Sequence, residues 1–315
     1  MCKVKIYDLL NDAYKELLWG HRYIKCENIF SRTREEELKI VKIAIIDSGL
    51  DIKHEDFRSD YKGYNFVSDS ADITDSIGHG TRVTGIIAAE KNNGIGVAGI
   101  ANGAQVFPLK VVDINGIALM NNIENALRWA IDNEVTLVNI SLNEEMQANN
   151  VSERWFYNSQ HGRIEELLKE ALNKDIIVVA PIGNKKDGLM GFPAEFPGVV
   201  SVGSYGINME NYCVTFSEFN AQYEENTVFA PGEYIFTTDL ANSYLYDSGT
   251  SFACAYVTAS FALLKAKSKN TTTSLEIKKL LVDALDTVED RNRIFKIINV
   301  DKAYKIGVER GILYE

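Results

Sequence analysis

Three short motifs in this chain place a carboxylate, an imidazole and a hydroxyl where each could take part in catalysis. Asp47 follows the apolar run in KIAIID, His79 stands between two glycines in IGHGT, and Ser251 precedes an apolar helical pattern in SGTSFACAYV. Taken singly, such residues are more typical of turns, caps and packed side chains. A serine nucleophile, however, needs a neighbouring base, and a carboxylate can orient the imidazole that serves as that base. Together, the three residues therefore indicate acyl transfer through Ser251.

A fourth polar residue belongs to the same hypothesis. Asn184 lies in PIGNKKDG, directly after the apolar run DIIVVA. Acyl transfer passes through an oxyanion, which an Asn amide and a backbone N–H can stabilise. A serine at a helix N-terminus adds further N–H groups and a favourable dipole. An isolated loop asparagine is typical of a turn, but in this company we predict that Asn184 is an oxyanion donor.

The elements around these motifs predict an α/β fold. Apolar, β-branched runs predict strands at 43–46, 106–112, 136–140, 176–180 and 199–202, and helical spacing predicts helices at 121–133, 164–173, 252–264 and 274–285, with a last packed element at 297–304. Strands that are apolar throughout and separated by helices indicate a parallel sheet covered on both faces. In such sheets ligands bind beyond the carboxyl ends of the strands.

The first 40 residues are too few for a core of their own. We expect 1–40 to form an extension that packs on a main domain at 41–315, with an amphipathic helix at 7–19 and a polar connection at 31–37.

Composition excludes several classes of function. The chain has 33 Lys and Arg against 44 Asp and Glu, a net charge of −11, which argues against nucleic acid or an anionic membrane as a partner. The four cysteines have no metal-ligand spacing, the start has no signal-peptide pattern, and 252–264 is too short to span a bilayer. We expect a reduced, cytoplasmic protein, and its oligomeric state stays open.

The four motifs resemble the signature blocks of the subtilisin-like serine proteases, the subtilases. DSG at Asp47, HGT at His79, GN at Asn184 and GTSxA at Ser251 occur in that family's order, and the resemblance runs from about residue 19 to 304. It implies a doubly wound, mainly parallel seven-stranded sheet with helices on both faces. It also implies a serine endopeptidase in which Ser251 is the nucleophile, His79 the general base, Asp47 the orienting carboxylate and Asn184 the oxyanion donor. The chemistry requires no cofactor.

The resemblance also implies a cleft in which a peptide substrate pairs with the main chain. The matching substrate-binding residues are Asn115, Gly116 and Ile117 on one side, Ser141, Leu142 and Asn143 on the other, and Gly191 with Pro193 in the floor loop. Asn143 stands where subtilases usually keep glycine, and Lys185 lies near the same pocket. If Asn143 and Lys185 point into the pocket, they make it narrower and more polar, and cleavage would be selective. Alternatively, both side chains point to solvent. Glu144 and Glu145 nearby could favour basic residues of the substrate.

Two departures lie close to the triad. Arg82 replaces a second histidine that usually follows HGT, and Ala255 replaces a proline that usually follows the serine block. The lost proline could shift the nucleophile slightly, and small shifts cost rate. We interpret Cys254 as a small buried residue rather than a second nucleophile.

The segment KNNGIGVAGI is similar to a calcium-binding loop of many subtilases. We expect a structural Ca²⁺ held by side-chain oxygens of Asp56 and Asn93 and by the carbonyls of Lys91, Ile95 and Val97. Without the metal, the same segment would be an ordinary polar loop.

The branch of the family is a finer hypothesis. Only 46 residues precede Asp47, which leaves no room for a folding propeptide, and WGHRYIKCENIF is similar to the leader peptidases of lanthipeptide clusters. We therefore expect a selective intracellular protease that acts on a precursor peptide. A general intracellular subtilisin is the enzyme alternative, and a non-catalytic peptide-binding scaffold is the alternative from another class.

Overall fold

The computed structural model describes residues 6–142, 151–186 and 188–315, without side-chain detail at 151–161. Its strands are β1 (Lys42–Asp47), β2 (Tyr64–Asn65), β3 (Gln105–Lys110), β4 (Leu137–Ile140), β5 (Ile177–Pro181), β6 (Val200–Ile207), β7 (Val214–Phe216), β8 (Val228–Pro231), β9 (Ile235–Asp239), β10 (Ser243–Asp247), β11 (Asp286–Asp290) and β12 (Arg293–Ile297). Its helices are η1 (Ile6–Leu9), η2 (Lys15–Leu17), α1 (Trp19–Tyr23), α2 (Glu27–Arg32), α3 (Glu35–Leu38), α4 (His79–Ala88), α5 (Met120–Asp132), α6 (Val151–Asn173), α7 (Thr250–Ala266), α8 (Ser274–Asp283) and α9 (Val300–Glu309).

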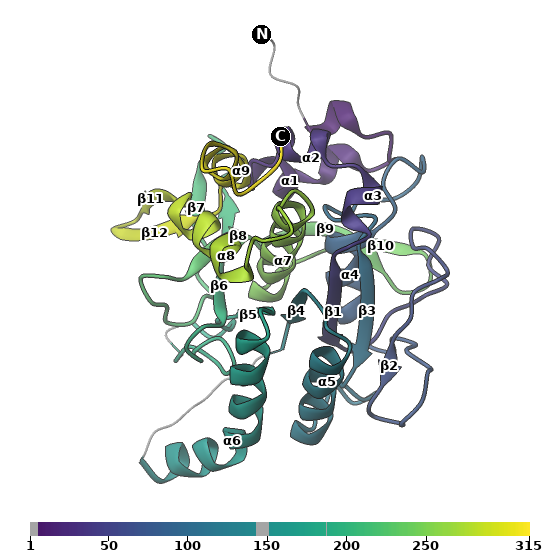
Figure 1. Ribbon diagram of the computed structural model, residues 1–315, viewed down its shortest axis with the longest axis vertical. Coiled ribbons are helices and arrows are strands. Elements are labelled where there is room, and N and C mark those ends of the chain that lie inside the picture. Colours follow the sequence, from purple (N-terminus) through teal and green to yellow (C-terminus); the bar gives the residue numbers. More distant parts are fainter. Residues whose placement is uncertain (1–5, 143–150, 187) are drawn as a thin grey trace.

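A mainly parallel sheet forms the centre of the molecule (Figure 1), as predicted. Within the described residues it has ten strands in the order β11-β12-β8-β6-β5-β4-β1-β3-β2, with β7 beside β6. The seven strands from β8 to β2 in this order pair in parallel throughout. The sheet is wider than the predicted seven strands because β7, β11 and β12 extend it, and β7 and β11 run antiparallel to their neighbours.

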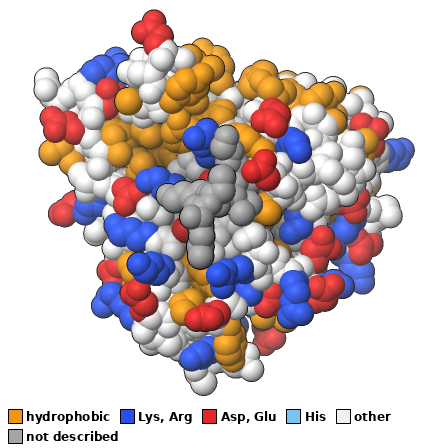
Figure 2. Space-filling view, turned by 90° about the horizontal axis from the view of Figure 1, so that it is seen from above, with side chains coloured by type: hydrophobic (Ala, Val, Ile, Leu, Met, Phe, Trp, Pro, Cys, Tyr) orange, Lys and Arg blue, Asp and Glu red, His pale blue; other side chains and the backbone are white. Residues whose placement is uncertain are grey.

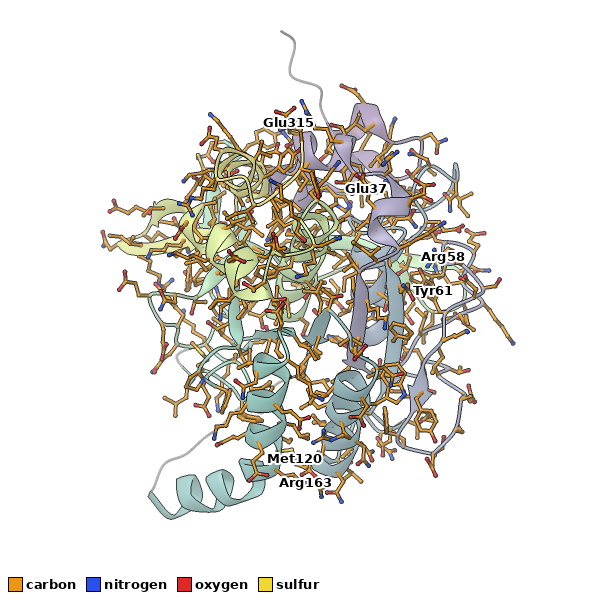
Figure 3. The ribbon with its side chains drawn as sticks, in the orientation of Figure 1. Glu37, Arg58, Tyr61, Met120, Arg163 and Glu315 are labelled. Carbon is orange, nitrogen blue, oxygen red and sulfur yellow. The ribbon has the colours of Figure 1, made fainter. Side chains whose placement is uncertain are left out.

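Helices cover both faces of the sheet because successive strand residues point to opposite sides. In β1, Ile43 and Ile45 belong to the core that includes residues of α4, α7, α8 and α9, whereas Ala44 and Ile46 belong to the core on the other face, with residues of α5 and α6. Helix α7 is apolar on every side and runs through the core. The helices α5 and α6 lie side by side at the lower end of the molecule, where Figure 3 labels Met120 and Arg163.

The N-terminal segment packs on the main body, but it does not contain the predicted helix at 7–19. That prediction was wrong: η1 and η2 are short 3₁₀ turns, separated by Asn11 and Asp12. The Asp12 carboxylate accepts the N–H of Asn92 at 2.8 Å, and Asn11 Oδ1 accepts the N–H of Gly94 at 3.0 Å. Side chains that bond to backbone elsewhere compete with helix formation.

Apolar residues of this segment belong to the main core, among them Ile6, Leu18, Ile29 and Phe30. Figure 2 shows the face on which the segment lies, where charged side chains of both signs are interspersed and hydrophobic ones gather toward the upper part. Within the described residues, no helix is long and apolar enough to cross a membrane.

Two hairpins were not predicted from the sequence. Strands β9 and β10 pair through the turn residues Ala241 and Asn242, and β11 and β12 pair through Arg291 and Asn292. All four turn residues have positive φ, between 47° and 65°. Hairpin turns with two successive residues of positive φ favour Asn-Gly or Asp-Gly, so neither Ala241-Asn242 nor Arg291-Asn292 is a strong hairpin signal.

Candidate active site

The sheet brings the predicted catalytic residues to one edge. Asp47 is the last residue of β1, and Asn184 lies in the loop beyond the carboxyl end of β5. His79 is the first residue of α4, and Ser251 is the second residue of α7. Parallel strands end at the same edge, which is why residues far apart in the sequence can converge there.

Asp47 and His79 are in direct contact. His79 Nδ1 lies 2.8 Å from Asp47 Oδ1 and 3.0 Å from Oδ2. A carboxylate at this distance places the proton on Nδ1 and leaves Nε2 as the acceptor. Asp47 is buried, and the N–H of Ser48 also bonds to Oδ1 at 2.7 Å. The imidazole is 27% exposed, so the ring is held on one side and open on the other.

The surroundings raise the pKa of His79. Burial lowers the pKa of this imidazole, but the carboxylates of Asp47, Asp247 and Asp75 together outweigh burial, with Asp47 contributing most. The net shift favours the protonated ring that a general base becomes during reaction.

Asp75, which no motif in the sequence indicated, holds the start of α4. Its Oδ1 accepts the N–H groups of Ile77 and Gly78 at 2.9 Å, and its Oδ2 accepts the N–H and hydroxyl of Thr81. Burial raises the pKa of Asp75, yet these hydrogen bonds outweigh it and the net shift is downward. An acidic residue just before a helix start is a capping signal that could have identified it.

Ser251 is buried at the N-terminus of α7. Its hydroxyl donates to the carbonyl of Ser141 at 3.1 Å, and the Ser141 hydroxyl donates to the carbonyl of Ser251 at 3.3 Å. Within the described residues, the bond to the Ser141 carbonyl is the one hydrogen bond that the Ser251 hydroxyl donates. The two helix starts lie close together: the His79 ring lies 5.9 Å, centroid to centroid, from the ring of Phe252, the residue after Ser251. A bond from Ser251 to His79 would require the hydroxyl to leave Ser141, and catalytic hydrogen bonds often form only with substrate bound.

A buried network of polar side chains on β4 and α7 holds the Ser141 hydroxyl in place. Asn139 donates to the Ser141 hydroxyl at 2.7 Å, and its Oδ1 accepts from Thr258 at 2.8 Å and from Cys254 at 3.3 Å. Burial raises the pKa of the Cys254 thiol, which keeps it protonated and unreactive. Cys254 is therefore a small buried residue, as interpreted from the sequence.

Asn184 is held by the residue that precedes the serine. Its Oδ1 accepts the N–H of Thr250 at 2.8 Å and the Thr250 hydroxyl at 2.9 Å. Because two donors face Oδ1, the other end of the amide is Nδ2, and a Cβ placed on Gly249 would lie 3.5 Å from that nitrogen. The amide donor therefore lies against the Gly-Thr-Ser segment, where an oxyanion on a Ser251-bound carbon would form.

The predicted substrate-binding residues have different outcomes. Ser141 contacts Ser251 directly, and Leu142 follows it. Gly116 and Ile117 lie in the loop after β3. The Ile117 N–H donates to Asp113 Oδ1 and the Ile117 carbonyl accepts the N–H of Asp113, both at 2.9 Å, so Ile117 presents its side chain rather than its main chain.

Gly191, predicted in the pocket floor, is buried, and its N–H bonds to the carbonyl of Ile182 at 3.0 Å. Asn143, with Glu144 and Glu145, lies outside the described residues.

The predicted calcium ligands form a hydrogen-bonded cluster instead. Asn93 Nδ2 donates to Asp56 Oδ1 at 2.8 Å, and the Val97 N–H donates to Asp56 Oδ2 at 2.7 Å. Val97 therefore turns its N–H toward the carboxylate, whereas a calcium ligand would turn its carbonyl to the ion. Burial raises the pKa of Asp56 to about 6, although these donors oppose the shift. Calcium requires six to eight oxygens that face the ion.

As arranged, the predicted set of Asp56, Lys91, Asn93, Ile95 and Val97 does not fit this requirement. Within the part of the chain that the structure describes, no group of three or more His, Cys, Asp or Glu side chains could hold a metal ion, and Val97 turns an N–H rather than an oxygen toward Asp56.

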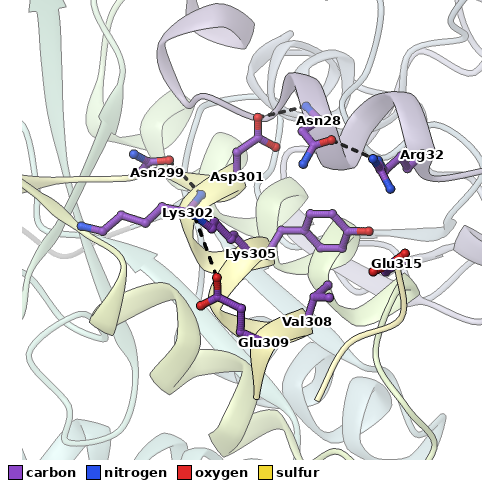
Figure 4. Close-up of a pocket in the computed structure, with 10 residues that line it drawn as sticks. Asn28, Arg32, Asn299, Asp301, Lys302, Lys305, Val308, Glu309 and Glu315 are labelled. Carbon is purple, nitrogen blue, oxygen red and sulfur yellow. Dashed lines mark hydrogen bonds and ion pairs between the residues drawn. The ribbon is translucent and has the colours of Figure 1, made fainter. Parts of the chain in front are cut away.

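A cavity of about 680 Å³ lies between α2 and α9 (Figure 4). Asn28 and Arg32 line one side, and Tyr304, Lys305 and Glu309 line the other. It includes none of the predicted catalytic residues, and its charges of both signs define no ligand class.

Comparison with known proteins matches residues 39–301 to the subtilase family. The thermophilic serine proteinase of Bacillus sp. strain AK1 is 31% identical over 256 residues, which cover 81% of this chain and 59% of that protein. The minor extracellular protease Epr of Bacillus subtilis is 34% identical over 78% of this chain and 35% of Epr. Subtilisin Savinase of Lederbergia lenta is 31% identical over 80% of this chain and 91% of Savinase. The chain thus spans somewhat over half the length of the thermophilic proteinase, about a third of Epr and most of Savinase.

Proposed function

This chain belongs to the subtilase family, and from that premise we propose that it is a serine endopeptidase that hydrolyses peptide bonds through an acyl-enzyme on Ser251. The observation that carries the proposal is the contact of 2.8 Å between His79 Nδ1 and the buried carboxylate of Asp47. It leaves Nε2 on the open side of the ring as a base for the Ser251 hydroxyl.

In the first half-reaction, Ser251 Oγ attacks the carbonyl carbon of the substrate while its proton passes to Nε2 of His79. Asp47 stabilises the resulting imidazolium through Nδ1–H. The oxyanion receives hydrogen bonds from Asn184 Nδ2 and the Ser251 N–H. The C–N bond then breaks, the proton on Nε2 goes to the departing amine, and the acyl group stays on Oγ.

In the second half-reaction, water repeats these steps in the amine's place. His79 accepts a proton from the water as it attacks the acyl carbon, and it returns that proton to Ser251 Oγ when the acid departs. Every proton is moved by a residue of the chain, and no cofactor enters.

A fluorophosphonate probe tests this activity, because it labels a serine only when a base and an oxyanion site activate it. We expect labelling of the folded chain and none in Ser251→Ala. Peptide turnover should fall about a million-fold in Ser251→Ala and roughly 10²–10³-fold in Asn184→Ala.

Ser260→Ala is the matched control, since Ser260 lies on the same helix and its hydroxyl bonds, among the described residues, to the carbonyl of Tyr256. It should keep full labelling. A well-folded wild-type chain that takes no label would instead favour the non-catalytic scaffold.

We propose further that the enzyme is a selective processing protease that removes a leader from a precursor peptide in the cytoplasm. The loop after β3, the strand beside β1, supports selectivity because it exposes three aliphatic side chains, Ile114 (75%), Ile117 (54%) and Leu119 (61%). An apolar edge beside Asp47 favours substrates with apolar residues N-terminal to the cut.

Profiling against a peptide library tests this selectivity. We expect cleavage of a few sequences with an apolar residue shortly before the cut, and Ile117→Ser should lower kcat/KM on them about tenfold. Ile294→Ser is the control, because Ile294 is similarly exposed on β12, at the far side of the sheet. Equal cleavage of unrelated sequences would favour a general subtilisin.

A further inference from the structure

Arg82 is tied to two carboxylates beside the candidate active site. It lies one turn after His79 on α4, and its side chain is mostly buried. Arg82 Nε donates to Asp239 Oδ1 at 2.8 Å, and one terminal nitrogen donates to Asp247 Oδ2 at 2.9 Å. One guanidinium therefore bridges two acids, a geometry that a lysine ammonium does not reproduce.

The two acids end the two strands of the β9–β10 hairpin. Asp239 is the last residue of β9 and Asp247 the last of β10. Thr237 and Thr238 on β9 add hydrogen bonds to the carbonyls of Arg82 and Thr81, at 2.8 Å and 2.9 Å. The hairpin is thus docked on the first turn of the helix that carries His79.

A close approach at Gly78 makes this docking possible. Gly78 precedes α4 with φ of 90°, and a Cβ there would lie 2.8 Å from Asp239 Oδ1. Glycine is suited both to this φ and to the space that the carboxylate occupies.

Asp247 connects the cluster to the nucleophile. It stands four residues before Ser251, and the hairpin leads through it directly into the Gly-Thr-Ser segment. We infer that Arg82 is a positioning residue for the proposed reaction: it holds the segment that leads to Ser251 against the helix that starts at His79, and it neutralises the Asp247 carboxylate beside the imidazole. This inference rests on the proposed function.

The carboxylates that act on the charge of His79 define what Arg82 controls. Asp47 at the end of β1 bonds to the ring, and Asp247 at the end of β10 and Asp75 in the loop before α4 also raise the pKa of His79. Arg82 is the cation that bonds to Asp247, and it also bonds to Asp239 on β9. Without Arg82, the Asp247 carboxylate would act on the ring uncompensated, and a negative charge nearby favours the protonated imidazole.

The test is an NMR titration of the histidine rings in a Ser251→Ala background, so that the readout needs no activity. The chain has four histidines, and His79→Gln identifies the His79 signal. We expect Arg82→Ala to raise the pKa of His79 by about half a unit to one unit. Asp247→Asn should lower it, and the double variant Arg82→Ala/Asp247→Asn should return it close to the starting value.

Two further variants separate charge from fold. Arg82→Lys keeps the charge without the bridge, so it should leave the pKa of His79 nearly unchanged while lowering kcat with Ser251 present. Arg128→Ala is the control, because Arg128 bonds bidentately to Glu170 on the α5–α6 side and should move neither quantity.

An unchanged pKa of His79 in both Arg82→Ala and Asp247→Asn would overturn the inference. Failure of the proposed function would appear elsewhere, as absent probe labelling of the wild-type chain.

Discussion

At the scale of single residues, the candidate site depends on neighbours that do no chemistry themselves. Ser48 bonds to Asp47 through its N–H and to Gly80 through its hydroxyl, so it joins β1 to α4. Thr250 fixes the amide of Asn184 with two donors. These contacts hold donors in place before substrate binds, which is where electrostatic catalysis gains its advantage.

Thr250→Val tests that orientation. Valine keeps the shape and the N–H bond but removes the hydroxyl that donates to Asn184 Oδ1. One neutral hydrogen bond is worth about 1 kcal/mol, so we expect kcat to fall about five- to tenfold with KM nearly unchanged. Steady-state kinetics on a peptide measures the change.

Thr84→Val is its control, because the buried Thr84 hydroxyl has no hydrogen-bond partner within the described residues. That variant should keep kcat and lose no stability. A Thr250→Val enzyme with wild-type kcat would contradict the orienting role of the hydroxyl.

At the scale of elements, α1 is locked against the helix that carries Ser251. His21 on α1 is buried between the Ala98 carbonyl, 2.6 Å from Nε2, and the Tyr256 hydroxyl on α7, 3.2 Å from Nδ1. Nε2 therefore donates and Nδ1 accepts, which is the neutral ring. Burial lowers the pKa of His21 to about 4, although the Ala98 carbonyl opposes the shift.

This neutral histidine makes stability depend on pH. The unfolded chain protonates His21 below its ordinary pKa of about 6.5, whereas the folded chain resists until about pH 4. The contribution is complete above pH 6.5 and is lost as pH falls toward 4, by about 3 kcal/mol in the free energy of unfolding.

Comparison with His21→Gln isolates this effect in urea unfolding at several pH values. The difference in unfolding free energy between wild type and variant should shrink as the pH falls from 6.5 to 4. The comparison is needed because Asp56 acts in the opposite direction: its raised pKa favours the folded chain at low pH. A difference independent of pH would contradict the neutral assignment.

At the scale of the whole molecule, one sheet explains why the site lies where it does. The strands from β8 to β2 run parallel, so their carboxyl ends form a single edge. Asp47, Ser141 and Asn184 leave from that edge, and α4 and α7 pack on one face with their first turns there. The N-terminal segment completes the same core, so it stabilises α7 as well as covering it.

The amino-acid sequence by itself determined the α/β class, the run of parallel strands and the motifs at Asp47, His79, Asn184 and Ser251. These are local signals: strand burial appears as apolar runs, and each motif is contiguous. The predicted helix at 7–19 failed because Asn11 and Asp12 bond to a loop some eighty residues later.

Only the tertiary structure decided features that depend on distant partners. The turn of the β9–β10 hairpin has no strong sequence signal. The part that Arg82 plays becomes visible only in the fold, which places Asp239 and Asp247 within hydrogen-bonding distance of its guanidinium. The Ser251 hydroxyl points to Ser141, and the carboxylate of Asp56 accepts N–H groups of Asn93 and Val97. A side chain's hydrogen-bond partner is chosen by the packing of whole elements, and no local pattern in the chain encodes it.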